Sequence, residues 1–470
     1  MDTRTDNTGE RLPATLRTLR DAWQARVPDL AQRRTDLQRL RDAFRAEQAA
    51  MDAAIRADFG HRSEHENLIS ESMVVLAEID HVLKHLRRWS RRRRVGSGWR
   101  FWPARAWIEP RPLGVVGILS PWNYPVNLAL MPLVSAIAAG NHVYLKPSEH
   151  TPATSAWLRD LLARVFPADR VAVALGGADV GAAFAALPFD HLLFTGSTAV
   201  GRKVMAAAAP NLTPVTLELG GKAPAVVCPG FDLAKAAARI ATGKWINAGQ
   251  TCIGVDYVLV EASRRDAFID AVLDELHHRY GDISASPDYT RIINDAQLGR
   301  LRGYIDDARQ RGARVIEPFD GTEGVERLLA PTLVVDPPLE SEVMRHEIFG
   351  PILPVLSYRT LDEALATLQC LPRPLALYPF TDRKADVGRI LDAALPGGVT
   401  VNDTLLHFGV HDLPFGGVGP SGIGSIHGRH GFDTFSKLLP VVHQARWAGS
   451  DMIRPPYTGR VDTLIRWLSK

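Results

Sequence analysis

The apolar residues that precede Gly96 recur at the spacing of a helix. They form two sets, Leu37, Leu40 and Phe44, and further along Leu76, Ile79, Leu83 and Leu86. Residues three and four positions apart lie on one face of an α-helix, so each set predicts a helix with one buried face. Between Gly96 and Trp107 this pattern gives way to glycine, proline and aromatic residues, which indicates a short extended hairpin.

From Leu113 onward, short apolar runs of the buried-strand type alternate with helical stretches. The predicted strands are 113–119, 142–145, 171–175, 191–194, 225–227 and 257–260. The predicted helices are 127–139, which Gly140 ends, and then 157–166, 203–209, 233–246 and 265–280. Such alternation favours parallel sheets covered by helices, so we predict an α/β protein with two sheet domains and a cleft between them.

Composition narrows the class of protein. A chain of 470 residues is long for one domain, and the length alone indicates about three. The hydrophobic fraction of 46% and the charged fraction of 23% are those of an ordinary globular protein. A net charge of +3 is too small to indicate nucleic-acid binding. The chain shows no signal-type apolar core at its N-terminus and no apolar run of the roughly 18 residues that a membrane span needs.

The cysteines are few and widely spaced. Cys228, Cys252 and Cys370 form no CxxC pair and no metal-ligand spacing. An odd, sparse count is typical of a reducing compartment, so we expect a cytoplasmic protein. An isolated cysteine is most often a small buried apolar residue, and this is the prediction for Cys228 and Cys370. Solvated or capping roles suffice for the fifteen histidines, and no metal site is predicted.

Two glycine-containing segments each carry one reactive side chain. The first reads Glu-Leu-Gly-Gly-Lys from Glu218 to Lys222, and the second reads Gly-Gln-Thr-Cys and ends at Cys252. As a thiolate, Cys252 can attack a carbonyl carbon, and Glu218 can activate water. Taken alone, Glu218 is also consistent with a strand-end ion pair to Lys222. Together, a thiol nucleophile and a separate base indicate acyl-enzyme chemistry on an aldehyde.

With these segments the chain resembles the NAD(P)-dependent aldehyde dehydrogenases along most of its length. The resemblance also rests on Pro121-Trp122-Asn123-Tyr124-Pro125, Lys146-Pro147-Ser148-Glu149, Phe194-Thr195-Gly196-Ser197 through Gly201, His346-Glu347-Ile348-Phe349-Gly350-Pro351 and Leu413 through Gly419. The N-terminal region and the segment from Asn402 to His407 are similar to the class 3 branch. Within it, the tail Arg454-Pro455-Pro456-Tyr457 is similar to bacterial coniferyl-aldehyde dehydrogenases.

The resemblance implies roles for three catalytic residues. Cys252 is the nucleophile, and the side-chain amide of Asn123 joins the Cys252 backbone N–H in stabilising the oxyanion. Glu218 is implied as the base that activates water, which favours hydrolysis to a free acid. Without the resemblance, Asn123 reads as a turn residue between two prolines.

No GxGxxG motif follows the early strands, so the ordinary dinucleotide fingerprint is absent. The glycine segment from Gly196 to Gly201 lies between a predicted strand and a helix, where backbone N–H groups can bind pyrophosphate, although Gly-Ser is also an ordinary helix cap. The resemblance implies that Lys146 and Glu149 reach the adenosine ribose, that Glu347 holds the nicotinamide ribose and that Phe349 packs beside the ring. The full set implied for the cofactor is Trp122, Lys146, Ser148, Glu149, Gly196, Ser197, Gly201, Leu219, Glu347 and Phe349.

The sequence partly indicates which nicotinamide cofactor, NAD or NADP, the protein uses. A carboxylate at Glu149 repels a 2′-phosphate and accepts a hydrogen bond from a 2′-hydroxyl, so NAD is the predicted cofactor. Lys146 attracts a phosphate, so the use of NADP is also compatible with the sequence.

The resemblance also divides the chain. Residues 1–95 and 111–216 form a Rossmann-like cofactor-binding domain, 217–434 a catalytic domain, 96–110 and 435–450 a small β oligomerisation arm, and 451–470 a C-terminal tail. The resemblance implies a homodimer, and the tryptophan-rich arm supports an interface there, because exposed tryptophans usually mark one. The implied substrate is a hydrophobic aldehyde, either aromatic, such as coniferyl aldehyde, or medium-chain.

Some features keep other interpretations open. A catalytically idle binding or structural protein, and a thiol esterase that works without cofactor, are both compatible with the fold. Gly254-Val255 stands where relatives usually have Ala-Pro, and Ile426 stands where a tyrosine is common. The run from Arg91 to Arg94 is either a phosphate or membrane patch or a solvated helix end, and we predict the helix end.

Overall fold

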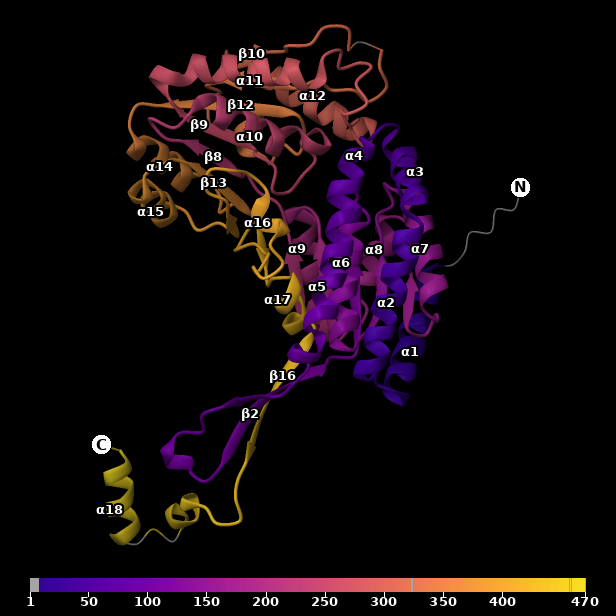
Figure 1. Cartoon of the computed structure of the whole chain (residues 1–470), viewed down its shortest axis with the longest axis vertical. Helices are drawn as coiled ribbons and strands as arrows, with labels where there is room; N and C mark the ends of the chain where they lie inside the picture. The colour runs from indigo at the N-terminus through magenta and orange to yellow at the C-terminus, as the bar shows by residue number, and fades with distance from the viewer. Residues whose placement is uncertain (1–7, 323, 456, 458, 470) are drawn as a thin grey trace, which may run out of the picture.

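The computed structural model describes residues 8–322, 324–455, 457 and 459–469. Figure 1 shows two sheet-containing lobes and a thin arm that extends away from them. The first lobe is built on a six-stranded sheet, the second on a seven-stranded sheet and the arm on a three-stranded sheet. The predicted α/β class with two largely parallel sheets is confirmed.

The N-terminal region is helical, as predicted. Its elements are α1 (Thr8–Ala25), α2 (Leu30–Ala46), α3 (Gln48–Phe59), α4 (Glu64–Asn67), the π-helical turn η1 (Leu68–Met73) and α5 (Val74–Trp89). The predicted inward faces of α2 and α5 are buried, with Leu76 half-buried at the margin. Asp29 caps α2 by accepting a hydrogen bond from the Gln32 backbone N–H at 2.8 Å.

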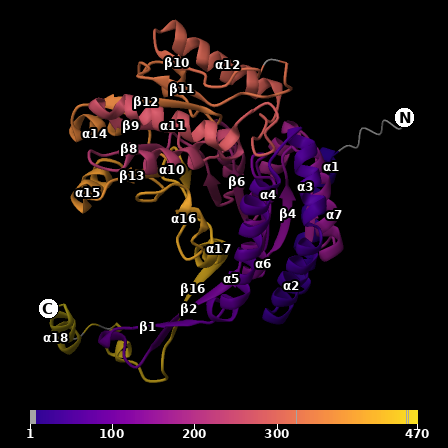
Figure 2. The same cartoon turned by 45° about the horizontal axis from the view of Figure 1, so that its top comes forward.

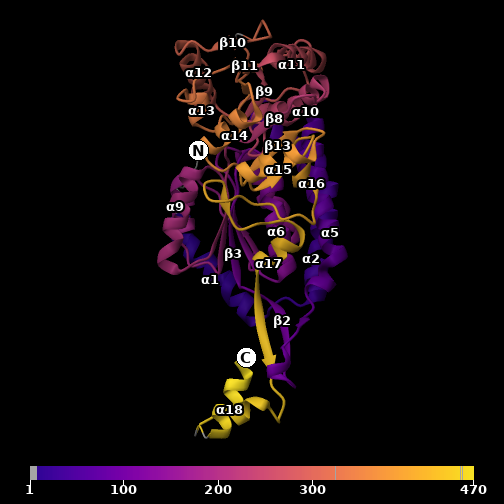
Figure 3. The ribbon, with the colours of Figure 1, turned by 90° about the vertical axis from the view of Figure 1, so that its left-hand side faces the viewer.

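The six-stranded sheet has the order β15-β7-β6-β3-β4-β5. Its strands are β3 (Val115–Leu119), β4 (His142–Lys146), β5 (Val171–Val173), β6 (His191–Thr195), β7 (Val215–Glu218) and β15 (Gly422–Ile423), and only β15 is antiparallel to its neighbour. The connecting helices are α6 (Asn127–Ala139), α7 (Pro152–Val165), α8 (Ala178–Ala185) and α9 (Thr198–Ala208), followed by the 3₁₀ turn η3 (Ala209–Asn211). Figure 3 shows α1 and α9 on one face of this sheet and α2, α5 and α6 on the other.

The seven-stranded sheet has the order β10-β11-β12-β9-β8-β13-β14, with β10 antiparallel to β11. Its strands are β8 (Pro224–Val227), β9 (Tyr257–Glu261), β10 (Arg314–Ile316), β11 (Thr332–Val335), β12 (Ile352–Tyr358), β13 (Ala376–Phe380) and β14 (Gly398–Val399). Its helices are α10 (Leu233–Trp245), η4 (Ile246–Gly249), η5 (Ala262–Arg264), α11 (Arg265–Tyr280), α12 (Asp295–Gln310), α13 (Glu342–Arg345), α14 (Leu361–Cys370), α15 (Lys384–Ala393) and α16 (Leu406–Gly409). The next helix, α17 (Gly428–Thr434), packs against α5 and α6 of the first lobe.

The arm sheet joins β1 (Arg93–Val95), β2 (Arg105–Pro112) and β16 (Ser436–His443). Figure 2 shows this sheet reaching out from the first lobe towards the C-terminal segment. The hairpin predicted between Gly96 and Trp107 is shifted, because most of that stretch connects the strands and contains the 3₁₀ turn η2 (Trp99–Phe101). The tail contains η6 (Gly449–Ile453) and α18 (Gly459–Leu468), and Pro456, Thr458 and Lys470 lie outside the described residues.

Two predictions about single segments need correction. Both Cys228 and Cys370 were predicted to be buried. Cys228 is buried, but Cys370 is exposed. The inward face of α14 is formed by Ala364 and Leu368, and Cys370 lies two residues later, on the opposite side of the helix. The run from Arg91 to Arg94 is exposed but is not a helix end, because α5 stops at Trp89 and the run continues into β1.

No helix in the described part of the chain combines the length and apolarity that a membrane crossing requires.

Candidate active site

The carboxyl ends of four strands in the six-stranded sheet bring the predicted residues to one edge. Asn123 follows β3, Lys146 ends β4, Gly196 follows β6, and Glu218 ends β7. Since β4 lies on one side of β3 and β6 on the other, the chain reverses its winding direction beside β3. Ligands of open α/β sheets bind in the crevice at such a reversal.

Cys252 enters this crevice from the second lobe on a strained turn. Asn247 and Ala248 both have positive φ, at 52° and 50°, and Gly249 follows with φ 74°. A Cβ at Gly249 would lie 2.3 Å from the Gly350 carbonyl oxygen, so only glycine fits there. Backbone strain of this kind persists where the surrounding contacts fix it, and the thiol that the turn carries is half-buried.

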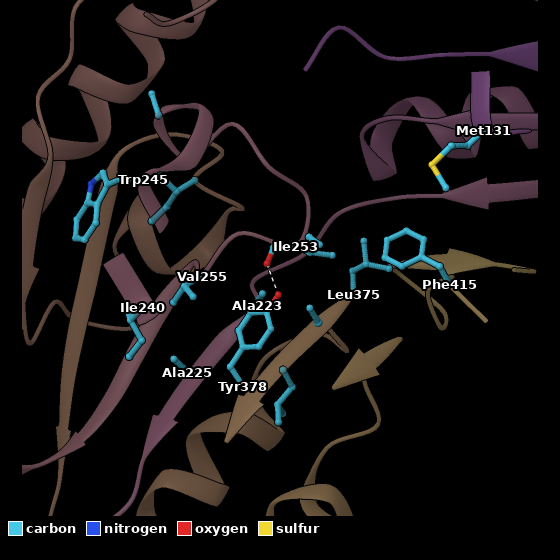
Figure 4. Close-up of a cluster of buried hydrophobic side chains, with 14 of the residues drawn as sticks. Met131, Ala223, Ala225, Ile240, Trp245, Ile253, Val255, Leu375, Tyr378 and Phe415 are labelled. Carbon is cyan, nitrogen blue, oxygen red and sulfur yellow. Dashed lines mark hydrogen bonds between the residues drawn. The ribbon is translucent and has the colours of Figure 1, made fainter. Parts of the chain in front are cut away.

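Hydrogen bonds hold the turn from several sides. The Gln250 side chain donates to the carbonyl oxygens of Asn247 and Arg291 at 3.0 Å each and accepts from the Ile293 backbone N–H at 3.0 Å. Figure 4 shows the buried cluster beneath the turn, where the Tyr378 hydroxyl donates to the Ile253 carbonyl oxygen. The turn therefore packs against the buried core and is not surrounded by solvent.

Asn123 belongs to the same network as Cys252. Its Nδ2 donates to the Gln250 carbonyl oxygen at 3.0 Å, which leaves the second amide hydrogen for another acceptor. Its backbone carbonyl oxygen accepts from Nδ2 of Asn247 at 2.9 Å. The Tyr124 hydroxyl and Thr251 Oγ1 are 2.7 Å apart. The loop after β3 and the turn before Cys252 are thus tied together at several points.

Beneath these two loops lies a fully buried arginine that the sequence analysis did not single out. Arg62 donates to the Asn123 carbonyl oxygen at 2.9 Å and pairs with Glu71 at 3.5 Å. Its guanidinium lies 4.9 Å from the ring centroids of both Phe59 and Tyr124. Burial raises the pKa of Glu71 to about 7, an effect that the charge of Arg62 opposes. Nothing local in the sequence distinguishes this arginine from the exposed ones.

Glu218 is buried, and neither of its carboxylate oxygens has a hydrogen-bond partner among the described residues. Lys222 instead bonds to Asp256 and donates to the carbonyl oxygens of Val343 at 2.7 Å and His346 at 2.9 Å. The alternative ion pair between Glu218 and Lys222 is therefore wrong. Burial raises the pKa of Glu218 well above its usual value.

A second carboxylate, Glu347, also faces the thiol. Burial raises the pKa of Cys252 to about 12, with a contribution from the negative charges of Glu347 and Glu218. Burial and the charge of Asp256 raise the pKa of Glu347 to about 8. A Cβ at Gly220 would lie 2.2 Å from the carboxylate oxygens of Glu347, so this glycine makes room for the carboxylate.

Lys244 is another buried charge that sequence reasoning missed, in the last turn of α10. Burial lowers its pKa to about 8, against the raising effect of Asp256.

The residues predicted for the adenosine side lie around the carboxyl end of β4 and the start of α9. Lys146 Nζ lies 2.7 Å from Glu149 Oε2, with the lysine buried and the carboxylate accessible to solvent. Burial acts to raise the pKa of Glu149, but the hydrogen bond and charge of Lys146 outweigh it and lower the pKa. The adjacent Ser148 is buried, and its hydroxyl accepts from the His150 backbone N–H at 3.2 Å.

At the start of α9, Ser197 caps the helix by accepting from the Val200 backbone N–H at 3.4 Å. A Cβ at Gly201 would lie 2.7 Å from Leu219 Cδ2, so this glycine lets the helix approach the end of β7. Because the Val200 N–H is capped, an anion at this helix start would bind the preceding N–H groups, which have no acceptor within the helix.

The two lobes meet at an aromatic contact. The rings of Trp122 and Phe349 are edge-on, with centroids 5.3 Å apart and an interplanar angle of 83°. Trp122 comes from the loop after β3, whereas Phe349 belongs to the second lobe and has a positive φ of 50°. Within the described residues, no cluster of histidine, cysteine and carboxylate side chains is arranged to hold a metal ion.

The comparisons with known proteins agree with this geometry. The family model for the Aldehyde dehydrogenase family matches residues 13–440. A probable coniferyl aldehyde dehydrogenase of Pseudomonas aeruginosa is 51% identical over 439 residues, which cover 93% of this chain and 92% of that protein. Aldehyde dehydrogenase family 3 member A2 of Rattus norvegicus is 41% identical over 433 residues, covering 92% and 88%.

Among solved structures, the substrate-bound state of Staphylococcus aureus AldH superposes with a TM-score of 0.93 at 36% identity and covers 97% of this chain and 99% of that one. The family profile, the curated relatives and the fold thus point to one assignment. The chain belongs to the aldehyde dehydrogenase family.

Proposed function

We propose that this aldehyde dehydrogenase uses Cys252 to oxidise a hydrophobic aldehyde, aromatic or medium-chain, to the carboxylic acid. The observation that carries the proposal is the convergence of a half-buried thiol, two buried carboxylates and the Asn123 amide on one crevice. The coniferyl-type relatives favour an aromatic substrate such as coniferyl aldehyde.

The first step forms a bond between Cys252 Sγ and the aldehyde carbon. The thiol must lose its proton, because the thiolate is the nucleophile. The carbonyl oxygen becomes an oxyanion, which the Asn123 amide and the Cys252 backbone N–H are suited to stabilise. The free hydrogen on Asn123 Nδ2 supports this role, since the other one is already held by Gln250. The chemistry that NAD would supply when bound is acceptance of the hydride of the substrate carbon, which would leave the acyl group on Cys252 as a thioester.

The second half of the reaction releases the acid from the resulting thioester. Glu218 takes a proton from water, the hydroxide adds to the thioester carbon, and Cys252 leaves as the thiolate. The two orphaned oxygens of Glu218 support this assignment, since a structural carboxylate in such a buried position would normally be satisfied. A thiol esterase that works without cofactor would use the same nucleophile, but it would form no NADH from an aldehyde.

We further propose that NAD is the preferred cofactor. The carboxylate of Glu149 stays ionised and accessible, as acceptance of a hydrogen bond from a ribose hydroxyl requires. Its contact with Lys146 partly cancels the two charges, so NADP binding is weakened but not abolished. The first turn of α9 is proposed to hold the pyrophosphate, Glu347 the nicotinamide ribose and Phe349 the ring.

The division of the chain is also part of this proposal. We assign 1–95 and 111–216 to cofactor binding, 217–434 to catalysis and the arm to a homodimer contact, in a cytoplasmic protein. One structural detail refines these boundaries, because β15, from the catalytic segment, adds to the six-stranded sheet. Trp102 and Trp447, at 75% and 85% exposed, are the side chains on the arm side of the molecule that such a contact would cover.

The direct test is an assay of purified protein that follows NADH formation across a panel of aldehydes. The panel contains coniferyl aldehyde, benzaldehyde, hexanal and short charged semialdehydes. We expect the highest kcat/KM for the aromatic and medium-chain members. A strong preference for the charged semialdehydes would contradict the proposed substrate class.

A further inference from the structure

A groove of about 410 Å³ lies where the arm leaves the first lobe, and arginines line much of it. Arg88 comes from the end of α5, Arg91 and Arg92 from the turn that follows, Arg93 from β1 and Arg429 from α17. None of them belongs to the crevice around Cys252. The groove therefore gathers positive charge from separate elements at a place that the proposed reaction does not use.

Most of this charge is not compensated by the protein. Arg429 donates to Asp433 at 2.8 Å, and the guanidinium of Arg92 lies 5.2 Å from the centroid of the Trp107 ring. For Arg88, Arg91 and Arg93, no carboxylate among the described residues lies within ion-pair distance. Like charges held close together repel, so a bound anion would stabilise this arrangement.

The strand register gives the groove a defined face. Arg93 pairs with Ile108 and Arg94 pairs with Trp107 across β1 and β2. Side chains alternate along a strand, so Arg93 and Ile108 lie on one face of the arm sheet and Arg94 lies on the other. Leu438, which pairs with Pro110, is on the face of Ile108 and also lines the groove.

An apolar floor lies between the arginines. Trp89 is buried, and Ile108, Pro110 and Leu438 complete the lining. The volume falls within the range of about 300–1,000 Å³ that is usual for small-molecule sites. Apolar surface beside unpaired guanidinium groups suits a ligand with one anionic and one apolar end.

The helix dipole does not account for this arrangement. Cations in the last turn of a helix are stabilised by the dipole, which explains Arg87 and Arg88 in α5. The effect falls off within that turn, whereas Arg91 and Arg93 lie beyond the C-cap residue Ser90. The dipole thus accounts for Arg88 but not for Arg91 and Arg93.

We propose that this groove binds an organic phosphate, with the phosphate group on Arg91 and Arg93 and the apolar group on the floor formed by Ile108 and Leu438. Guanidinium groups match phosphate in geometry and bind it through paired, charge-assisted hydrogen bonds. The same chemistry is offered by a soluble phosphate ester and by a phospholipid headgroup with its first acyl carbons.

The test compares two double variants of the full-length protein with the same loss of charge. Arg91→Gln/Arg93→Gln changes the groove, whereas Arg94→Gln/Arg105→Gln changes exposed arginines on the opposite face of the arm sheet. Binding of phenyl phosphate is measured by isothermal titration calorimetry, with inorganic phosphate and benzyl alcohol as probes of its two halves. NADH formation and thermal unfolding serve as checks that both variants are folded.

We expect wild type to bind phenyl phosphate more tightly than either half. The groove variant should lose at least about 10-fold in affinity, and the control variant should stay within about 2-fold. Sedimentation with phosphatidylcholine vesicles, with and without phosphatidic acid, then separates the sources. If the protein sediments with the vesicles that contain phosphatidic acid but not with phosphatidylcholine vesicles, the groove is a headgroup site. If the protein binds phenyl phosphate but sediments with neither kind of vesicle, its ligand is a soluble ester.

Three outcomes would overturn the proposal. One is that wild type binds neither phenyl phosphate nor acidic vesicles. Another is that both double variants lose affinity equally, which would mean diffuse attraction by the whole arm. The third is that the groove variant dissociates an oligomer while phosphate binding is unchanged, which would assign these arginines to a second copy of the chain.

Discussion

Ionisable groups without a partner occur in two regions of this molecule, carboxyl groups in one and guanidinium groups in the other, and the two regions differ in exposure. In the crevice, both carboxyl oxygens of Glu218 and one of Glu347 are buried and lack a hydrogen-bond partner among the described residues. At the base of the arm, Arg91 and Arg93 are exposed and lack a carboxylate partner there too. A buried unpaired charge costs several kcal/mol, whereas an exposed one costs little because water solvates it.

This difference in burial indicates which of the two regions depends on a rigid scaffold. The crevice can hold its unsatisfied carboxylates only because the surrounding loops are fixed, and Arg62 shows how this is done. That arginine is equally buried, but it is compensated by Glu71, by the Asn123 carbonyl oxygen and by two aromatic rings. Substitutions in the crevice should therefore have large effects on turnover, and those in the arm small ones.

The largest effect is expected for Cys252→Ala, which removes the proposed nucleophile. NADH formation should fall by at least about 10³-fold, because no other group can form the thioester. Binding of NAD, measured by calorimetry, should persist. Cys370→Ser is the matched control, since that thiol is exposed and lies on α14, and it should keep full activity. Substantial turnover by the alanine variant would rule out the assignment.

A pair of variants separates the two carboxylates of the crevice. Glu218→Gln should give a stoichiometric burst of NADH and then stall, because hydride transfer precedes hydrolysis, and its steady rate should fall by about 10²–10⁴-fold. Glu347→Gln should weaken NAD binding without stalling at the thioester. Rapid-mixing kinetics distinguish the two cases. A burst and stall in Glu347→Gln, with steady turnover in Glu218→Gln, would exchange the two roles.

The pH dependence follows from the direction of the shift in Glu218. A base acts only when deprotonated, and burial raises the pKa of this carboxyl well above its usual value. The hydrolysis rate should therefore rise with pH into the neutral range instead of levelling off near pH 5. This rise is measured by following the release of the acid in a single turnover across pH 5–9. A rate that does not vary with pH over that range would show that no such proton transfer limits hydrolysis.

A somewhat smaller effect is expected when the scaffold itself is changed. Arg62→Met should lower kcat by about 10²-fold, because Asn123 and Cys252 lose their common anchor, while KM for NAD stays close to wild type. Removing one partner of a buried pair also costs about 3–5 kcal/mol of stability, so unfolding is measured in parallel. Arg62→Lys should recover part of kcat. Equal losses in kcat and in NAD affinity would indicate general unfolding instead of a positioning role.

The sequence predicted the parts of this molecule that depend on local pattern. The helices 127–139 and 265–280 agree with α6 and α11 at both ends, and a glycine, Gly140 or Gly281, stands at each C-terminal cap. The motif residues were predicted from the resemblance, and the crevice now shows Glu218, Cys252 and Asn123 at one edge of the first sheet.

What the sequence could not give are contacts that depend on tertiary approach. The pairing of Lys222 with Asp256 instead of Glu218 is set by where β8 and β9 lie side by side. The burial of Arg62 depends on α3 and the loop after β3 meeting, and no local pattern separates it from the exposed Arg91. Cys370 was misassigned because an apolar stretch does not tell which side of a helix faces outward.

A modest effect is expected at the adenosine side of the crevice. Glu149→Gln removes the charge that repels a 2′-phosphate but keeps a hydrogen-bond acceptor, so NADP use relative to NAD should improve by up to about 1–3 kcal/mol. The ratio of kcat/KM values for the two cofactors measures this. Glu64→Gln, at the exposed start of α4, is a control for loss of one negative charge. An unchanged ratio would show that Glu149 does not contact the ribose.

The smallest effect on catalysis is expected in the arm. Trp102→Ser and Trp447→Ser remove exposed rings, at 75% and 85% exposure, and should leave kcat unchanged because neither residue contacts the crevice. If these rings form the proposed homodimer contact, light scattering should show that the variants dissociate into monomers at a higher protein concentration than wild type does. Leu212→Ser is the control, since this side chain is 88% exposed and lies outside the arm. A wild-type monomer at assay concentration would refute the interface. Dissociation by Leu212→Ser but not by the tryptophan variants would move it to the far side of the first lobe.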